Sequence, residues 1–327
     1  MKNIFKNFKN KERTFKFLTA AGLAVMIMVI FSFAAIVSAA DVTIVENAKA
    51  KIDYTDTNKT GTVKINTIGK LDSQKTQVRV EKIDAPDKTY SYEFKADGTI
   101  ESYPLQYGDG EYKITIIYQP IGSNKAASAL KCTITLKLID ENAPFLNPIK
   151  LVNYNKDSKV VKKAEELTKN CKTELEKVNA IYKFIIESMT YDNDKAAVVN
   201  GTYIPVIDDF INFEKGAGKG ICYDYASLFA AMLRSQGIPA KLIMGYMLDR
   251  NDPGDSNKAQ YHAWNEFYIK GVGWFMINKM KFDGDKNEFG RLDPTVESGV
   301  VGKSEKSYNM IIEYIGKSSN YLKSHEF

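Results

Sequence analysis

The apolar residues of this 327-residue chain change their spacing at one place, the segment Asp140-Glu141-Asn142-Ala143-Pro144. Before this segment, apolar and polar residues alternate with a period of two, which is the period of a half-buried β-strand. After it, apolar residues recur every three or four positions, which is the period of an amphipathic helix. We therefore predict an all-β domain over residues 41–145 and an α+β domain over residues 146–327.

The all-β domain has at least five short expected strands and no expected helix. Turn residues such as Asp97-Gly98 and Gly108-Asp109-Gly110 separate the strands. The apolar residues that mark the strands are Val63 and Ile65, Val78 and Val80, Tyr90 to Phe94, Tyr112 to Tyr118, and Cys132 to Leu138. This pattern is typical of a β-sandwich, and we predict one of immunoglobulin-like type.

The second domain is predicted to place helices first and antiparallel strands after them. Thr173-Glu174-Leu175-Glu176 is a capping box that opens one helix, and Gly237 with Pro239 ends another. The expected elements are helices over 158–171, 173–191 and 222–235, a loop to about 219, and strands over 240–246, 263–269 and 274–282. This order of elements is that of an α+β fold.

Residues 1–40 are expected to be a targeting segment. A basic stretch up to Lys16 precedes an apolar run over 17–37, and the small residues Ser38-Ala39-Ala40 follow it. The run approaches the ~20 residues that span a bilayer, so a cleaved signal peptide and an uncleaved membrane anchor are both alternatives. Either one would deliver the folded part of the chain to the outside of the membrane.

The net charge of +5 belongs entirely to this leader, which holds six basic side chains and one acidic side chain. The rest of the chain has equal numbers of basic and acidic residues and is formally neutral. Because nucleic-acid binding depends on neutralising phosphates with a basic surface, we expect no nucleic-acid partner.

The three cysteines occupy different sequence settings. Cys132 is in phase with the alternation of an expected strand, and Cys171 falls at helical spacing with its apolar neighbours. Both settings are typical of a free buried thiol that packs as a small hydrophobe. Cys222 fits neither pattern, because it follows Gly218-Lys219-Gly220 and begins an expected helix.

The position of Cys222 suits a reactive thiol. Free amide groups and the dipole at a helix N-terminus stabilise a thiolate, and the same amides can bind the oxyanion of a tetrahedral intermediate. Glycines before the cysteine let a substrate backbone approach closely. On spacing alone, a cysteine that only caps a core helix is an equal alternative.

The chain has only two histidines, and His325 lies close to its last residue. The other, His262, lies in the aromatic segment 261–268, which is an expected strand. A cysteine at a helix start and a histidine on a strand can form a nucleophile–base pair. With so few histidines and no paired cysteines we expect no zinc site. The acidic clusters at 249–255 and 283–288 lack the ligand pattern of an EF-hand loop, so we interpret them as solvated loops and expect no metal or cofactor.

Three segments of the second domain resemble conserved blocks of the transglutaminase-like superfamily. The segments are GKGICYDYASLFAAMLRSQGIPAKLIMGY, YHAWNEFYIKGVGWF and RLDPT. The resemblance implies a papain-like α+β domain with a Cys-His-Asp triad, in which Cys222 is the nucleophile and His262 the general base. It also implies an aspartate after the histidine strand that orients His262. The superfamily includes cross-linking transglutaminases, peptide deglycosylases and cysteine proteases.

The third triad residue has two candidates. Asp293 matches the terminal block of the family but lies thirty-one residues after His262. In many relatives the interval is about half as long, which points to Asn278, and an asparagine can also orient an imidazole. We favour Asp293 and interpret residues 280–290 as an inserted hairpin that lengthens the interval between His262 and the terminal block.

The second donor of the oxyanion hole is not given by the resemblance. Cross-linking transglutaminases use a tryptophan upstream of the cysteine and papain-like proteases use a glutamine, and residues 146–222 contain neither. The amide of Cys222 can supply one hydrogen bond. Tyr191 is our candidate for the other, with Tyr203 as the alternative, although a tyrosine at either position could simply be packed in the core.

The expected activity is acyl transfer or hydrolysis on peptide or protein amides through a Cys222 thioester. The acyl acceptor is an amine or water, with a slight preference for water. We expect substrates outside the membrane, including cell-wall-associated proteins, and a protein that is secreted or anchored at the cell surface. The alternative is a non-catalytic surface adaptor whose transglutaminase-like domain has lost its activity.

Overall fold

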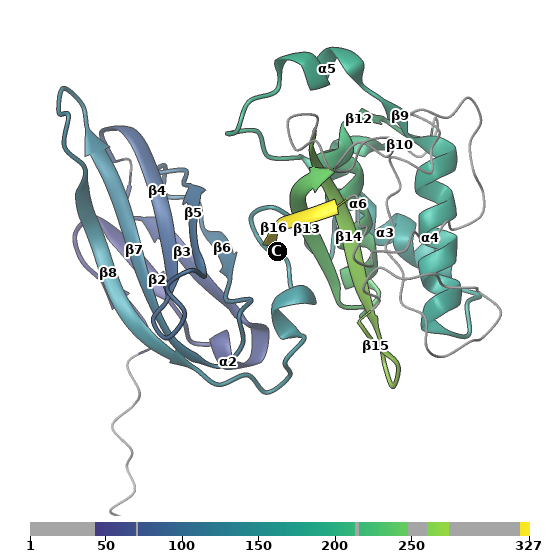
Figure 1. Cartoon of the computed structure of the whole chain (residues 1–327), viewed down its shortest axis with the longest axis horizontal. Coiled ribbons are helices and arrows are strands. Elements are labelled where there is room, and N and C mark those ends of the chain that lie inside the picture. The colour runs from purple at the N-terminus through teal and green to yellow at the C-terminus, as the bar shows by residue number, and fades with distance from the viewer. Residues whose placement is uncertain (1–42, 70, 213–215, 248–259, 275–320) are drawn as a thin grey trace, which may run out of the picture. The chain divides into compact units, whose positions relative to one another are not determined.

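The computed structural model describes residues 43–69, 71–212, 216–247, 260–274 and 321–327 (Figure 1). Residues 44–327 belong to one compact unit. The leader, both acidic clusters, Asn278 and Asp293 lie outside the described residues. Within the described part of the chain, no helix is long and apolar enough to cross a membrane.

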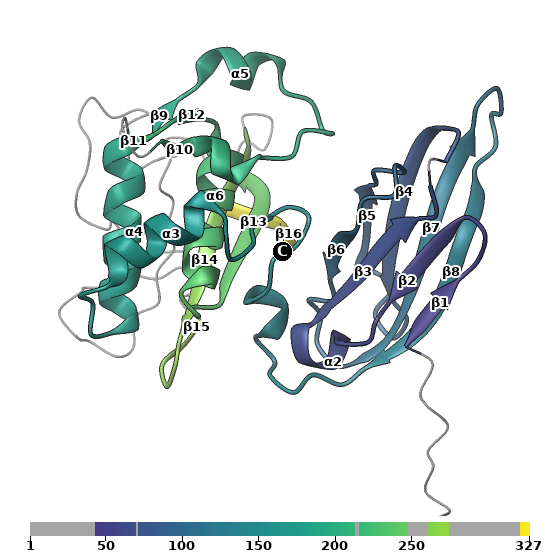
Figure 2. The same ribbon diagram turned by 180° about the vertical axis from the view of Figure 1, so that it is seen from behind.

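The described residues before 140 form two four-stranded antiparallel sheets, with strand orders β1-β2-β3-β6 and β5-β4-β7-β8 (Figures 1 and 2). The first sheet consists of β1 (Ile44–Glu46), β2 (Ala50–Asp53), β3 (Thr62–Thr67) and β6 (Glu101–Pro104). The second consists of β4 (Ser73–Lys82), β5 (Thr89–Glu93), β7 (Gly110–Pro120) and β8 (Ala127–Leu136). Alternate side chains of both sheets enter one apolar core.

The expected strands of this region are confirmed, while three strands and one short helix were not predicted. Strands β1, β2 and β6 are three or four residues long, too short to show a clear period. The helix α2 (Thr57–Thr60) is a single turn. The immunoglobulin-like type and the domain boundaries stay predictions.

Four helices follow in the second region: α3 (Lys159–Thr168), α4 (Glu174–Ser188), α5 (Asn193–Val198) and α6 (Cys222–Ser235). The capping box of α4 is confirmed, since the Thr173 hydroxyl accepts from the Glu176 amide (3.2 Å) and the Glu176 carboxylate accepts from the Thr173 amide (3.3 Å). Helix α6 has its predicted bounds. Helix α5 lies where we expected a loop, and the Asp192 side chain caps it by accepting from the Lys195 amide (2.9 Å).

The prediction that Cys171 lies within a helix is wrong. Helix α3 ends at Thr168, and Cys171 is half-buried in the turn that follows. The chain leaves the helical path because Glu176 also accepts from the Lys172 amide (2.5 Å), which draws this segment into the cap of α4. Cys132 does lie in a strand, β8, but its side chain is half-buried rather than buried.

A four-stranded antiparallel sheet completes the region, in the order β15-β14-β13-β16. Its strands are β13 (Ala240–Met247), β14 (Gln260–Ile269), β15 (Gly273–Trp274) and the unpredicted β16 (Tyr321–Glu326). Helix α6 packs on β13 and β14, and α3 and α4 pack on α6 (Figure 2). Helix α6 is therefore the central element of this region, covered by a sheet on one side and by helices on the other.

Two further strand pairs lie next to the start of α6. The two-residue strands β9 (Thr190–Tyr191) and β12 (Lys219–Gly220) pair in parallel. Strands β10 (Ile211–Asn212) and β11 (Gly216–Ala217) pair antiparallel. The β9–β12 pair joins the end of α4 to the chain just before Cys222.

Candidate active site

Cys222 is the first residue of α6, directly after the extended residue Ile221 (φ −96°, ψ 176°). The amides of Cys222 and Tyr223 belong to the first turn, where N–H groups have no acceptor within the helix. The Asp224 carboxylate accepts from the Ile221 amide (2.8 Å) and so holds the approach to the helix in place. The position can thus stabilise negative charge on the thiol sulfur or on a bound carbonyl oxygen.

Gly220 is needed for packing at this turn. A Cβ atom at Gly220 would lie 2.7 Å from the Asp224 Cβ and 3.0 Å from an Asp224 carboxylate oxygen. A larger residue would therefore push away the side chain that caps α6. From the sequence, we expected glycines here to let a substrate backbone approach closely. The structure shows that Gly220 also leaves room for the Asp224 side chain.

His262 lies on β14 with its side chain 4% exposed. It is paired with Gly245 of β13 across the sheet. The rings of His262 and the fully buried Trp264 are nearly parallel, with centroids 6.3 Å apart and an interplanar angle of 21°. The indole therefore limits the orientations that the imidazole can adopt.

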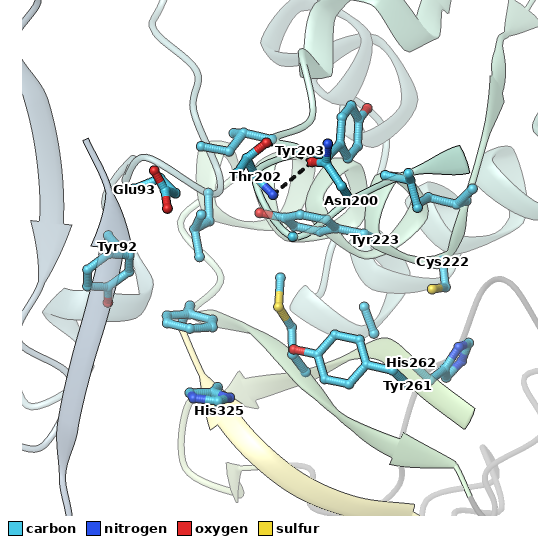
Figure 3. Close-up of a pocket in the computed structure, with 18 of the residues that line it drawn as sticks. Tyr92, Glu93, Asn200, Thr202, Tyr203, Cys222, Tyr223, Tyr261, His262 and His325 are labelled. Atoms are coloured by element: carbon cyan, nitrogen blue, oxygen red, sulfur yellow. Dashed lines mark hydrogen bonds between the residues drawn. The ribbon is translucent and has the colours of Figure 1, made fainter. Parts of the chain in front are cut away.

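Cys222 and His262 line the same cavity, which has a volume of about 530 Å³. In Figure 3 both side chains lie at the same end of this cavity. Its wall is rich in tyrosine: Tyr90, Tyr92, Tyr191, Tyr203, Tyr223 and Tyr261. A concave site with apolar rings and a few polar groups is the usual form of a binding site.

Tyr191 also lines this cavity, and its hydroxyl can act as a hydrogen-bond donor there. Burial, together with the nearby charges of Cys222 and Asp224, raises the pKa of Tyr191 above its usual value. The phenol therefore keeps its proton at neutral pH. The role of Tyr191 as a second oxyanion donor stays a prediction.

Tyr203 is less suitable for that role, because it already donates its proton. Its hydroxyl bonds the Asp224 carboxylate (2.7 Å). Burial and the Asp224 charge raise the pKa of Tyr203, which keeps this hydrogen bond intact over a wide pH range. We therefore favour Tyr191 over Tyr203.

Sequence reasoning missed the contribution of Asp224 and of α5. Asp224 is fully buried and forms an ion pair with Lys195 of α5 (2.5 Å). The amine of Lys195 also contacts the Tyr203 hydroxyl. One carboxylate thus ties the segment 193–203 to the first turn of α6. The sequence did contain one signal for Asp224: it is an acidic residue in the first turn of a helix, where the helix dipole stabilises its negative charge.

Residues of the all-β region and His325 also line the cavity, which the sequence did not predict. Tyr90, Ser91, Tyr92 and Glu93 of β5 contribute to the wall, as do Lys150 and His325. Burial lowers the pKa of His325, so this imidazole is neutral at pH 7. No local pattern separates these residues from ordinary strand residues. Among the described residues, no group of three or more His, Cys, Asp or Glu side chains could hold a metal ion.

Comparison with known proteins places these residues in a family. Residues 161–278 match the model of the transglutaminase-like superfamily, a range that includes both Cys222 and His262. The chain contains a transglutaminase-like domain. The expected resemblance is thereby confirmed, and the α+β region around α6 and β14 is the core of this domain.

The transglutaminase-like domain has similar sequences among bacterial proteins. A protein-glutamine gamma-glutamyltransferase of Pseudomonas aeruginosa is 28% identical over 103 residues, which are 30% of this chain and 14% of the relative. An uncharacterized Bacillus subtilis protein, YebA, is 26% identical over 145 residues, which are 42% of this chain and 19% of the relative. The chain spans less than a third of the length of the curated relatives it matches.

Among solved structures, red sea bream transglutaminase is 12% identical, with a TM-score of 0.26 and coverage of 81% of this chain and 57% of that one.

Proposed function

We propose that the chain is an exported thiol enzyme that acts on peptide or protein amides through a Cys222 thioester. The observation that supports this most strongly is the position of Cys222 at the start of α6, in one cavity with His262. The matched transglutaminase-like model includes both residues. In this family, thiol chemistry is used for acyl transfer or for proteolysis.

In the proposed reaction, His262 takes the proton of the Cys222 thiol, and the thiolate attacks an amide carbonyl. The Cys222 amide and the Tyr191 hydroxyl donate hydrogen bonds to the resulting oxyanion. When the C–N bond breaks, His262 returns the proton to the leaving ammonia or amine. The thioester then passes its acyl group to a second amine or to water, which restores the thiol. No metal or cofactor takes part in these steps.

Orientation of His262 is assigned to Asp293, with Asn278 as the alternative. Both residues follow His262 in the sequence and lie outside the described residues. The argument for Asp293 is its match to the Leu-Asp-Pro-Thr block, and the argument for Asn278 is its shorter separation from His262. A polar partner on the second ring nitrogen is required to fix the tautomer that accepts the thiol proton.

The amide donor is proposed to be a glutamine side chain or a peptide bond of an extracytoplasmic protein. The name of the Pseudomonas aeruginosa relative supports glutamine as the donor. The leader sequence supports export, either secreted or anchored at the cell surface. We also propose that the all-β region is an immunoglobulin-like module that helps to position substrate.

A product analysis tests this function. The purified chain is incubated with a glutamine-containing peptide and a fluorescent primary amine, and the products are separated by mass. Stable amine incorporation identifies a transferase, whereas glutamate or a cleaved peptide identifies a hydrolase or protease. Either product should disappear in Cys222→Ala and persist in the matched variant Cys171→Ala. If no product forms on this peptide or on intact cell-surface proteins, the non-catalytic adaptor is the better description.

A further inference from the structure

Strand β5 (Thr89–Glu93) has one edge whose backbone N–H and C=O groups are available to pair with another strand. It ends the sheet order β5-β4-β7-β8, so within the described part of the chain only β4 pairs with it. In an antiparallel pair, every second residue turns its N–H and C=O toward the neighbour. The Phe94 amide donates to the Thr76 carbonyl (3.1 Å). By this alternation, Ser91 and Glu93 direct their backbone groups toward the other edge.

This edge borders the cavity of Cys222. Four consecutive residues of β5, from Tyr90 to Glu93, line the cavity. Successive side chains of a strand point to opposite faces, so a cavity that touches all four must run along the edge of the strand. Figure 3 shows Tyr92 and Glu93 at one side of the cavity and Cys222 at the other, with Tyr223 between them.

The chemistry of this wall suits an extended peptide rather than a charged ligand. Glu93 is compensated by Lys75 (3.6 Å), and Lys150 is compensated by Glu101 (2.6 Å). What the strand offers is a row of peptide N–H and C=O groups, which pair with another extended backbone. The tyrosine rings beyond it provide apolar surface with polar ends, which suits contact with varied side chains.

We propose that an extended segment of the substrate protein adds to the edge of β5, pairing with Ser91 and Glu93, and crosses the tyrosine-lined cavity to Cys222. The all-β region is then part of the substrate site. This inference rests on the proposed function and deepens it, because it names an unfolded or loop segment of a protein, rather than a small free amide, as the substrate.

A peptide affinity label tests the proposal without a known substrate. The label is acetyl-Thr-Ala-X-Ala-Thr-Ala-amide, where X is diaminopropionic acid with a chloroacetyl group on its side chain. Its rate of Cys222 alkylation is compared with that of free chloroacetamide, by mass spectrometry of the whole chain. Because each added hydrogen bond contributes up to about tenfold in affinity, we expect the peptide to react at least about tenfold faster at limiting concentration.

Proline substitutions on β5 then test the edge itself. Ser91→Pro removes an N–H of the edge that faces the cavity but no N–H that faces β4, so the sheet is retained. Thr89→Pro is the matched control, because Thr89 has the same parity on β5 but does not line the cavity. Ser91→Ala removes the hydroxyl and keeps the amide. We expect only Ser91→Pro to lose the peptide acceleration, while chloroacetamide reacts equally with all of the variants.

Alternate N-methylation of the label provides a second measurement that needs no variant. A peptide bound as a strand directs every second N–H toward β5. Methylation of one alternating set of amides should therefore abolish the acceleration, and methylation of the other set should preserve it. Equal effects of the two sets, or a peptide no faster than chloroacetamide, would overturn the inference while selective alkylation of Cys222 still supports the proposed function. If chloroacetamide itself does not select Cys222, the proposed function and this inference both fail.

Discussion

Asp224 contacts one neighbouring group, the Ile221 amide, and two groups from an earlier segment, the Tyr203 hydroxyl and the Lys195 amine. At the scale of single residues, this buried carboxylate holds together the first turn of α6, next to Cys222. The sequence alone predicted that Cys222 and His262 lie near one another, because a helix-start cysteine and a rare histidine stand out, and the two residues do line one cavity. The role of Asp224 could not be predicted, since its importance arises from Lys195 and Tyr203, which only the fold brings to it.

The first residue-scale prediction concerns the partner of His262. We expect Asp293→Ala to lower kcat by about 10³–10⁴-fold, the size of effect seen when a triad histidine loses its orienting group. Asn278→Ala is the matched variant and should lower kcat by less than about tenfold. Turnover of the glutamine peptide is measured for both, with circular dichroism to show that each variant is folded. The reverse ranking would assign the triad as Cys222, His262 and Asn278.

A second residue-scale prediction concerns alkaline pH. Burial raises the pKa of Tyr90 to about 12, above the value of ~10 expected in the unfolded chain. Between these values the unfolded state binds fewer protons than the folded state, so stability falls as pH rises from 10 to 12. Tyr90→Phe should therefore lose stability less steeply than the wild type over this range, by up to about 1.4 kcal/mol per pH unit. Urea unfolding at pH 9, 10, 11 and 12 measures the difference, and parallel curves would contradict it.

At the scale of elements, one side chain links α6, which begins with Cys222, to β14, which carries His262. Asn265 of β14 is fully buried, and its amide group donates to the Ala226 carbonyl of α6 (2.9 Å) and to the Lys241 carbonyl of β13 (3.1 Å). The helices with clear caps, α4 and α6, could be predicted because their signals are local. Helix α5 has a local N-cap, Asp192, that the sequence analysis did not use, and its contact with α6 through Lys195 and Asp224 is not local. Strands β6 and β16 could not be predicted, because pairing with distant strands stabilises them.

We expect Asn265→Ala to lower both stability and reactivity. Loss of two buried hydrogen bonds should cost about 2–3 kcal/mol in the free energy of unfolding. Because α6 can then shift relative to β14, alkylation of Cys222 should slow by about tenfold or more. The exposed residue Asn193 provides the matched control, Asn193→Ala, which should change neither value by much. A variant that loses stability but keeps the full alkylation rate would show that Asn265 has no positioning role.

At the scale of the whole described unit, buried contacts join the all-β region to the α+β region that follows it. Lys150 and Glu101 form a buried ion pair (2.6 Å), and Glu101 also accepts from the Tyr103 hydroxyl (2.5 Å). Phe327 packs on Tyr92, with ring centroids 5.8 Å apart. The change of period at residue 140 predicted two kinds of structure correctly. It could not predict that β5 would line the cavity of Cys222, because such contacts depend on three-dimensional placement rather than on periodicity.

The buried ion pair gives a prediction for this scale. Glu101→Gln should cost about 3 kcal/mol, because it leaves Lys150 charged and buried without a carboxylate. Burial already lowers the pKa of Lys150, so adding Lys150→Met should recover most of this loss. The exposed pair of Lys88 and Asp87 (3.5 Å) supplies the control, and Asp87→Asn should cost less than about 1 kcal/mol. The free energy of unfolding of each variant is measured with urea. A double variant that is less stable than Glu101→Gln would contradict this prediction.

The most direct test of the central claim is the rate at which each of the three cysteines is alkylated by iodoacetamide in the folded protein at pH 6–7. Burial raises the pKa of Cys132 to about 11, so Cys132 should remain an unreactive thiol, and Cys171 lies outside the cavity. We predict that Cys222 reacts at least about a hundredfold faster than either, because a base and a helix N-terminus favour its thiolate. His262→Ala should remove most of this advantage. Equal alkylation of all three cysteines, or a Cys222 rate unchanged in His262→Ala, would contradict the assignment of Cys222 and His262 as nucleophile and base.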